Sequence, residues 1–283
     1  MSDGRIDDRA VVVGYDGSPD STAALFLAAA DAGTTGSALW VSVVGDDRVQ
    51  SPPPRAYERI GATSAAEMLD LARALVLSRH PTLEVHHRTA RGPVAAALLA
   101  VAADARLLAV GAQGAGHEFA PAWGKVTGRV TGQAACPVLV AHAGNDLLSA
   151  TGRDAPRILV TLTGEALDDT VLHEGLELAQ RFRGAVRVLT LPADRGRASW
   201  CRLETLHRDS HLLDCRFYDD HIEALRRAVA RADLVVARVE GLEAVDGLLL
   251  GARSQALLAR LGRPVLAVPP SLDLRSRLVT GAR

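Results

Sequence analysis

Short apolar runs alternate with longer segments of helical pattern along almost the whole chain. Each run ends in glycine, proline or another turn residue, which is typical of strands buried on both faces. The alternation predicts an α/β fold in which parallel strands are joined by right-handed helical crossovers. In the first half the predicted strands are Ala10–Tyr15, Ala38–Val44, Leu83–Thr89, Leu107–Val110 and Pro137–Ala141, and the predicted helices are Pro19–Ala32, Ala62–Arg79, Pro93–Ala103 and Lys125–Ala134.

The second half repeats this pattern and predicts a tandem arrangement. Three landmarks recur at one separation of 127 positions, as Gly114 and Gly241, Gly124 and Gly251, and Pro137 and Pro264. Such regular spacing favours an internal repeat. The predicted strands are Arg157–Leu162, Ala185–Leu191, Leu213–Tyr218, Leu234–Val239 and Pro264–Val268, and the predicted helices are Asp168–Phe182, His221–Ala232 and Ser254–Leu261.

Turn residues divide the chain into two expected domains, residues 1–143 and 157–283. The segment Ala143–Pro156 is rich in glycine, asparagine and aspartate and is the expected linker. Gln50–Arg55 holds three consecutive prolines and is expected to form a surface loop. The closing strands Pro137–Ala141 and Pro264–Val268 are expected at sheet edges, which favours pairing between the two halves or between chains.

Composition narrows the possible partners and the compartment. The 283 residues are 48% hydrophobic and 23% charged, with a net charge of -1 and a pI near 6.8, so neither nucleic acid nor an anionic membrane is an expected partner. No apolar run is long enough to cross a membrane, and the polar start of the chain is unlike a signal segment, so the expected location is the cytoplasm. Three widely spaced cysteines, Cys136, Cys201 and Cys215, fit a reducing compartment and offer no zinc framework.

A glycine-rich loop is the strongest chemical signal in the chain. The buried run Leu107–Val110 leads into Gly111 and Gly114, and after nine further residues into Gly124 at the start of a helix. Glycines at a strand end let backbone approach an anion, and a helix start offers unpaired amides and a positive dipole end. Lys125, the single lysine of the chain, lies at this helix start. The sequence therefore predicts a phosphate-binding loop.

These motifs resemble those of the universal stress protein family, here as a tandem pair. The resemblance rests on Val11–Ser18 with its Asp16, on the glycine loop Gly111–Gly124, and on the closing run Cys136–Val140. It is strong in the first half and faint in the second. It implies, for each half, a doubly wound five-stranded parallel sheet of order 3-2-1-4-5 flanked by helices. Many members of the family bind ATP, so the resemblance implies ATP, alone or with magnesium, as the cofactor.

In the ATP-binding branch of the family the loop reads G-x2-G-x9-G-[S/T], and this chain departs from it at the last position. Lys125 replaces the small hydroxyl residue, so a charge pair with phosphate could compensate for the lost donor, or Thr127 could supply a hydroxyl. Asp16 matches the acid beside the adenosine, although Asp-Gly is also a favoured turn. Val43 matches the position whose backbone reads adenine, although a lone valine also fits the core. The resemblance thus assigns cofactor binding to Gly14, Tyr15, Asp16, Val43, Gly111, Gly114, Gly124, Lys125, Val126 and Thr127.

The second half departs further from the pattern and is expected not to bind nucleotide. Thr163 stands at the position of Asp16, Arg238 replaces the first loop glycine, and Ala252 follows the last one. This half is expected to pack against the first as a pseudo-twofold partner. A homodimer is a further expected assembly.

Catalytic motifs are missing or broken. A Walker loop would need glycine at Phe119 and a hydroxyl residue at Val126, and neither the G-x-S-x-G nor the H-E-x-x-H motif occurs. His86 and His87 are neighbours on a predicted strand, so they point to opposite faces and do not favour a metal site. The leading hypothesis is a stress-response regulatory protein that binds ATP in its first domain, with slow hydrolysis at most. The alternatives are a nucleotide-free interaction module of the same fold and a small-molecule enzyme of related architecture.

Overall fold

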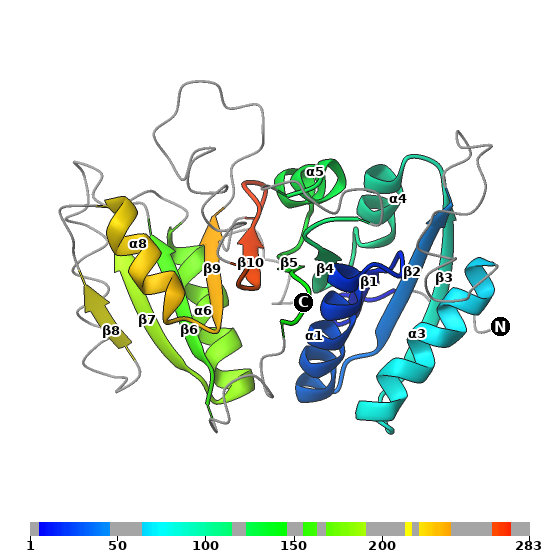
Figure 1. The fold of residues 1–283 in the computed structure, drawn as a ribbon, viewed down its shortest axis with the longest axis horizontal. Coiled ribbons are helices and arrows are strands. Elements are labelled where there is room, and N and C mark those ends of the chain that lie inside the picture. Colours follow the sequence, from blue (N-terminus) through cyan, green and yellow to red (C-terminus); the bar gives the residue numbers. More distant parts are fainter. Residues whose placement is uncertain are drawn as a thin grey trace, which may run out of the picture.

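One continuous sheet runs across the molecule, with β3 at one edge and β8 at the other (Figure 1). The computed structural model describes residues 6–45, 64–114, 123–145, 155–162, 168–190, 213–216, 221–238 and 262–272. Within them the strand order is β3-β2-β1-β4-β5-β10-β9-β6-β7-β8. The strands are β1 (Val11–Gly14), β2 (Leu39–Gly45), β3 (Val85–Arg91), β4 (Leu107–Gly111), β5 (Val138–Ala141), β6 (Arg157–Leu162), β7 (Ala185–Thr190), β8 (Leu213–Arg216), β9 (Leu234–Arg238) and β10 (Val265–Val268).

Each half contributes five neighbouring parallel strands in the expected order 3-2-1-4-5. In the first half β1 pairs with both β2 and β4, and in the second β6 pairs with both β7 and β9. The two closing strands then pair with each other, antiparallel, with Leu266 opposite Leu139. The expected pairing between the halves is therefore confirmed, and it joins two sheets that the sequence describes only separately.

Helices cover both faces of this sheet. They are α1 (Pro19–Thr35), α3 (Ala65–Arg79), α4 (Val94–Val101), α5 (Lys125–Gln133), α6 (Asp168–Phe182) and α8 (His221–Ala230). One buried cluster joins α1, α3 and α6 to the strands, and a second joins α4, α5 and α8 to the opposite face. Each cluster contains residues of both halves, so the core is continuous across the β5–β10 pairing.

Local sequence explains where α1 begins and ends. The Ser18 hydroxyl accepts a hydrogen bond from the Ser21 amide at 3.1 Å, which caps the helix, and Pro19 occupies its first turn. The prediction ended this helix at Ala32. The helix instead continues through Gly33 to Thr35, and the C-cap residue Gly36, with a φ of 65°, terminates it.

Other predicted boundaries differ by one to three residues. The prediction began β3 at Leu83, but the Leu83 amide closes a turn onto the His80 carbonyl at 3.1 Å, and the strand begins at Val85. The predicted helix Ser254–Leu261, the loop Gln50–Arg55 and residues 146–154 of the predicted linker lie outside the described residues. No described helix is both long enough and apolar enough to span a membrane.

Candidate functional site

The carboxyl ends of β1 and β4 form the edge at which the predicted site residues meet. These strands are neighbours, and the chain leaves them in opposite directions along the sheet, toward β2 and toward β5. Ligands of doubly wound sheets bind at such a switch point. A Cβ built on Gly114 would lie 3.1 Å from Asp16 Oδ2, and one built on Gly124 would lie 4.0 Å from the Gly114 amide nitrogen. The fold therefore brings Asp16, Gly114 and Gly124 together.

Asp16 takes part in the turn and in the site at once. Its Oδ1 accepts a hydrogen bond from the Ser18 amide at 3.0 Å, which fixes the turn between β1 and α1. Its Oδ2 lies on the side of Gly114. The two interpretations of Asp16, as turn residue and as crevice residue, are compatible because the two oxygens of one carboxylate face different groups.

The start of α5 presents backbone amides without a side-chain cap. Gly124 occupies the N-cap position, with φ -64° and ψ 162°, and its own amide donates to the Ala112 carbonyl at 2.9 Å. The first amides of a helix have no acceptor within the helix. Lys125 is exposed at the first position of α5, and Val126 is half-buried against the α4 side. An anion here would meet both the amides and an ammonium group.

The Thr127 hydroxyl has a partner within the chain. It is buried and donates its single proton to the Gly111 carbonyl at 2.8 Å. A hydroxyl with this hydrogen bond has no proton to donate to a phosphate, so the predicted binding role of Thr127 stays a prediction. Thr127 ties the first turn of α5 to the end of β4.

Gly111 is required by packing within the protein. A Cβ at this position would lie 2.7 Å from the Ser21 amide nitrogen and 2.9 Å from the Asp20 carbonyl carbon, both in the first turn of α1. Gly14 is similarly close-packed, because a Cβ there would lie 3.0 Å from a Leu98 methyl carbon. Both glycines let helices approach the strand ends closely. Their roles toward a ligand remain predictions.

Tyr15 and Val43 belong to the buried core next to the candidate site. The Tyr15 amide donates to the Ser42 carbonyl at 2.9 Å, and burial raises the pKa of its phenol, which a hydrogen bond with Thr22 partly offsets. The Val43 side chain is buried in the cluster that contains α1 and α3. Neither side chain is available at the surface, so any ligand contact here would involve backbone atoms.

Asp20 is an important residue that the sequence analysis missed. Its Oδ2 accepts from the Gln113 amide at 2.9 Å, and its Oδ1 accepts from the Ala143 amide at 2.8 Å. The only sequence signal is an acid in the first turn of a helix, which is common because it interacts well with the helix dipole. Asp20 thus satisfies one amide of the glycine loop from within the chain.

His142 lies behind this carboxylate, directly after β5. Burial lowers the pKa of its imidazole below the usual 6.5, although the nearby Asp20 opposes this shift. The indole N–H of Trp123, next to the cap residue Gly124, is buried and has no acceptor among the described residues. In the described parts of the chain, no three His, Cys, Asp or Glu side chains are grouped to hold a metal.

His86 and His87 lie on opposite faces of β3, as the alternation predicts. The His86 ring stacks on Trp40 with centroids 4.5 Å apart, and its Nε2 lies 2.8 Å from a Glu84 oxygen. His87 has Asp70 of α3 nearby, and burial lowers the pKa of its imidazole. The two imidazoles therefore share no site.

The equivalent edge of the second half is different. Arg238 ends β9, at the position where Gly111 ends β4, and is half-buried. A long side chain there replaces the close backbone approach seen in the first half. Thr163 and Ala252 lie outside the described residues.

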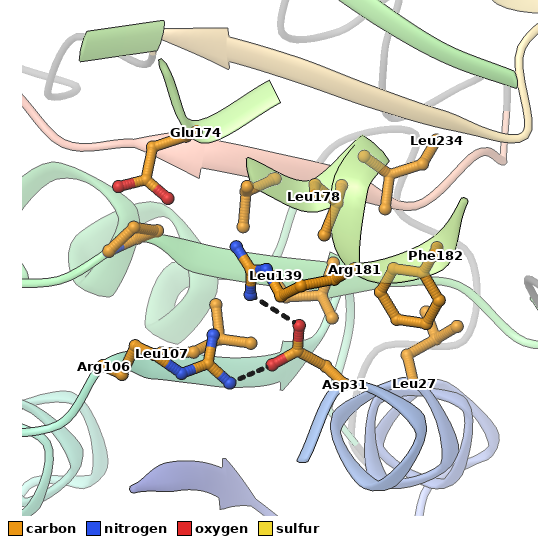
Figure 2. A pocket seen from close by; sticks show the side chains of 12 residues that line it. Leu27, Asp31, Arg106, Leu107, Leu139, Glu174, Leu178, Arg181, Phe182 and Leu234 are labelled. Carbon is orange, nitrogen blue, oxygen red and sulfur yellow. Dashed lines mark hydrogen bonds and ion pairs between the residues drawn. The ribbon is translucent and has the colours of Figure 1, made fainter. Parts of the chain in front are cut away.

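A small cavity also lies between α1 and α6, where Arg106 and Arg181 both point toward Asp31 (Figure 2). Its volume is about 10 Å³, which is close to the space that one water needs. Apolar side chains such as Leu27, Leu107 and Phe182 form much of its lining. This cavity is too small for a nucleotide, so the edge of the sheet at the glycine loop is the better candidate.

Comparison with known proteins supports the assignment of the first half. The family model described as the universal stress protein family matches residues 9–142. A universal stress protein of Mycolicibacterium smegmatis is 35% identical over 135 residues, which cover 46% of this chain and 44% of that protein. The chain therefore spans less than half the length of this relative.

Two further relatives extend over nearly the whole chain. A universal stress protein of Mycobacterium tuberculosis is 27% identical over 289 residues, which cover 92% of this chain and 97% of that protein. The crystal structure of a universal stress protein from Archaeoglobus fulgidus matches with a TM-score of 0.71 at 15% identity, covering 94% of this chain and 97% of that one. At this identity the structural likeness shows the fold alone.

Proposed function

The chain belongs to the universal stress protein family, and we propose that it is a stress-response regulatory protein whose first half, residues 1–143, binds ATP. One observation carries the proposal. The Asp16 carboxylate lies beside Gly114 at the switch point of the sheet, next to the uncapped start of α5. The carboxylate can accept from a ribose or adenine donor, and the helix start can receive phosphate oxygens.

The residues at this edge fit a nucleotide with one change from the usual loop. Gly114 is exposed, and a side chain at this position would project toward Asp16. Lys125 supplies positive charge where the family pattern has a hydroxyl, and Asp16 supplies the acid. Magnesium, when bound with ATP, would supply charge neutralisation to the phosphates.

Hydrolysis is proposed to be slow. A fast ATPase needs a group that positions or deprotonates the attacking water, together with stabilisation of the transferred phosphoryl group. Thr127 donates to Gly111, and Asp20 accepts from two backbone amides, so both are engaged in structural hydrogen bonds. The arrangement supports binding better than turnover.

A nucleotide-free interaction module is the second candidate, and one observation favours it. Asp20 already occupies the Gln113 amide, so the chain satisfies part of its own loop without any ligand. In that case the joined sheet and the surface around it would be the functional part.

Titration of ATP into the full-length protein by calorimetry separates these candidates, together with mass spectrometry of any ligand released on denaturation. We expect measurable binding to the wild type and a loss of about tenfold or more in Gly114→Ala, because the added methyl group intrudes between Asp16 and the ligand. Gly33→Ala is the matched control. Its Cβ would lie 3.6 Å from His80 Nδ1, on the far part of α1, so its affinity should equal that of the wild type.

The other outcomes each favour a different function. Undetectable ATP binding in the wild type, with no ligand released, would support the interaction module. Rapid turnover of a small molecule that disappears in Asp16→Ala, while the fold persists, would support an enzyme. Equal ATP affinity in the wild type and Gly114→Ala would place the nucleotide elsewhere.

A further inference from the structure

Asp20 connects the glycine loop of the first half to the junction with the second. It lies in the first turn of α1, and its two oxygens accept hydrogen bonds from two separate segments. Oδ2 holds the Gln113 amide at 2.9 Å, just after β4, and Oδ1 holds the Ala143 amide at 2.8 Å, just after β5. One rigid carboxylate therefore fixes the position of both segments relative to α1.

We call the Asp20 carboxylate and its two amide contacts the Asp20 bridge. Its contact with the segment after β5 continues into the second half of the chain. The His142 amide donates to Asn145 Oδ1 at 2.8 Å, and Asn145 Nδ2 donates to the Gly262 carbonyl at 2.7 Å. Gly262 has a φ of 60° and lies shortly before β10, which pairs with β5 (Figure 1). Three residues thus lead from the Asp20 carboxylate to the backbone of the other half.

The loop side of the bridge ends at the candidate nucleotide site. Gln113 is followed directly by Gly114, beside which Asp16 Oδ2 lies. The Ser18 hydroxyl, which caps α1, also lies 3.5 Å from the Gln113 carbonyl oxygen. A phosphate that binds near Gly114 would pull on the same short segment whose amide Asp20 holds.

We propose that Asp20 is a positioning residue that couples occupation of the glycine loop to the packing of β5 against β10. This proposal rests on the proposed function, because it takes ATP as the ligand of the loop. Displacement of the Gln113 amide moves the carboxylate, and the second oxygen of the same group moves the Ala143 amide with it. The coupling is physical contact through one shared group, and it acts equally in both directions.

The test uses the full chain in four forms: wild type, Asp20→Asn, Asn145→Ala and Asp7→Asn. In Asp20→Asn one acceptor oxygen becomes an NH2 group that faces an N–H donor, so one of the two contacts is lost with little change in volume. Asn145→Ala removes both side-chain contacts of Asn145, with the His142 amide and with the Gly262 carbonyl, and leaves the loop intact. Asp7→Asn is the matched control. Within the described residues, Asp7 Oδ1 accepts a local hydrogen bond from the Arg9 amide, two positions further along the chain.

Two measurements are made on each form, ATP affinity by calorimetry and backbone hydrogen exchange by mass spectrometry. In the wild type, ATP should slow exchange at residues 111–114 and also at 140–145 and 262–268. In Asp20→Asn, ATP should no longer slow exchange at 140–145 and 262–268. Both Asp20→Asn and Asn145→Ala should weaken ATP by about fivefold or more, whereas Asp7→Asn should not.

Two outcomes would contradict the proposed coupling. In the first, ATP binds the wild type but slows exchange at 111–114 alone. In the second, Asn145→Ala binds ATP as tightly as the wild type. Absence of ATP binding to the wild type is a different failure, since it overturns the proposed function. In that case, hydrogen exchange of the ligand-free forms still tests whether Asp20 links the two segments. Because Asp20→Asn keeps one acceptor oxygen, faster exchange at either 111–114 or 140–145 supports the link through Asp20, and exchange equal to that of the wild type at both segments overturns it.

Discussion

The Arg181 guanidinium of α6 reaches across the junction and donates to Asp31 of α1, with Nη1 2.7 Å from Oδ1 (Figure 2). Arg106, which precedes β4, donates to the other oxygen of the same carboxylate. The Asp31 side chain is only 2% exposed, so this is a buried acid with two basic partners. It links α1 of the first half to α6 of the second half.

Asp31→Asn should destabilise the protein more than Arg181→Met. Removal of the acid leaves two guanidinium groups close together and largely buried, which we expect to cost about 3–5 kcal/mol of unfolding free energy. Arg181→Met leaves Asp31 paired with Arg106, so its loss should be smaller. Guanidinium unfolding of each variant measures the difference. Losses below about 1 kcal/mol in both would show that the pair behaves like a surface ion pair.

Gly111→Ala should lose stability because of the close approach of α1. The added methyl group meets backbone atoms of Ser21 and Asp20 at under 3 Å, and backbone cannot move aside easily. We expect a loss of about 1–3 kcal/mol. The control Gly33→Ala lies within α1, where alanine favours the helix and meets nothing closer than 3.6 Å, so it should be as stable as the wild type or more stable. Equal stability of the two variants would contradict the packing role of Gly111.

Lys125→Ala tests whether the ammonium group contacts phosphate. If it does, ATP affinity should fall by about fivefold while adenosine affinity stays unchanged, because adenosine carries no phosphate. The loss should shrink at high salt, since exposed charge pairs are screened. Arg129→Ala is the control, because Arg129 is exposed one turn further along α5 and should leave both affinities unchanged. An equal loss of ATP and adenosine binding would place the Lys125 side chain away from the phosphates.

Acidification should destabilise the fold through two half-buried histidines. Burial lowers the pKa of His142 and of His87 below the usual 6.5, so the unfolded chain binds protons at a pH where the folded chain does not. The unfolding free energy should therefore fall as the pH drops from about 7 through 6.5. His142→Gln should flatten this dependence, as measured by denaturant unfolding at several pH values. A pH profile identical to that of the wild type would assign the effect to other groups.

Asp233 should affect the unfolding free energy at a lower pH than the two histidines do, so the two effects can be measured separately. Burial raises the pKa of this carboxyl, but hydrogen bonds from the Arg157 side chain and amide outweigh that effect and hold it below the usual 3.8. Its contribution is present above 3.8 and is lost as the pH falls below that value. Loss of stability between about pH 7 and 5 therefore reports the histidines, and any further loss near pH 3 includes Asp233.

The sequence by itself determined the fold class, the alternation of strands and helices and the residues placed at the strand ends, whereas the order of the strands came from the resemblance to the universal stress protein family. These features depend on local patterns, since strands, caps and glycine turns are set by neighbouring residues. Asp16, Gly114 and Gly124 meet because parallel strands bring their carboxyl ends to one edge. Within the part of the chain that the structure describes, errors at this level were confined to element ends, such as the continuation of α1 to Thr35.

Only the tertiary structure decided what several residues contact. Asp20 holds amides 93 and 123 positions away, and Arg181 reaches Asp31 across 150 positions. The same holds for Gly111, which meets α1, and for Thr127, whose proton goes to Gly111. Such contacts arise when packing brings distant segments together, and no local pattern of charge or hydrophobicity specifies which distant partner a side chain will meet. The joining of β5 to β10 is of the same kind, because an edge strand shows that pairing is possible and the surrounding helices select the partner.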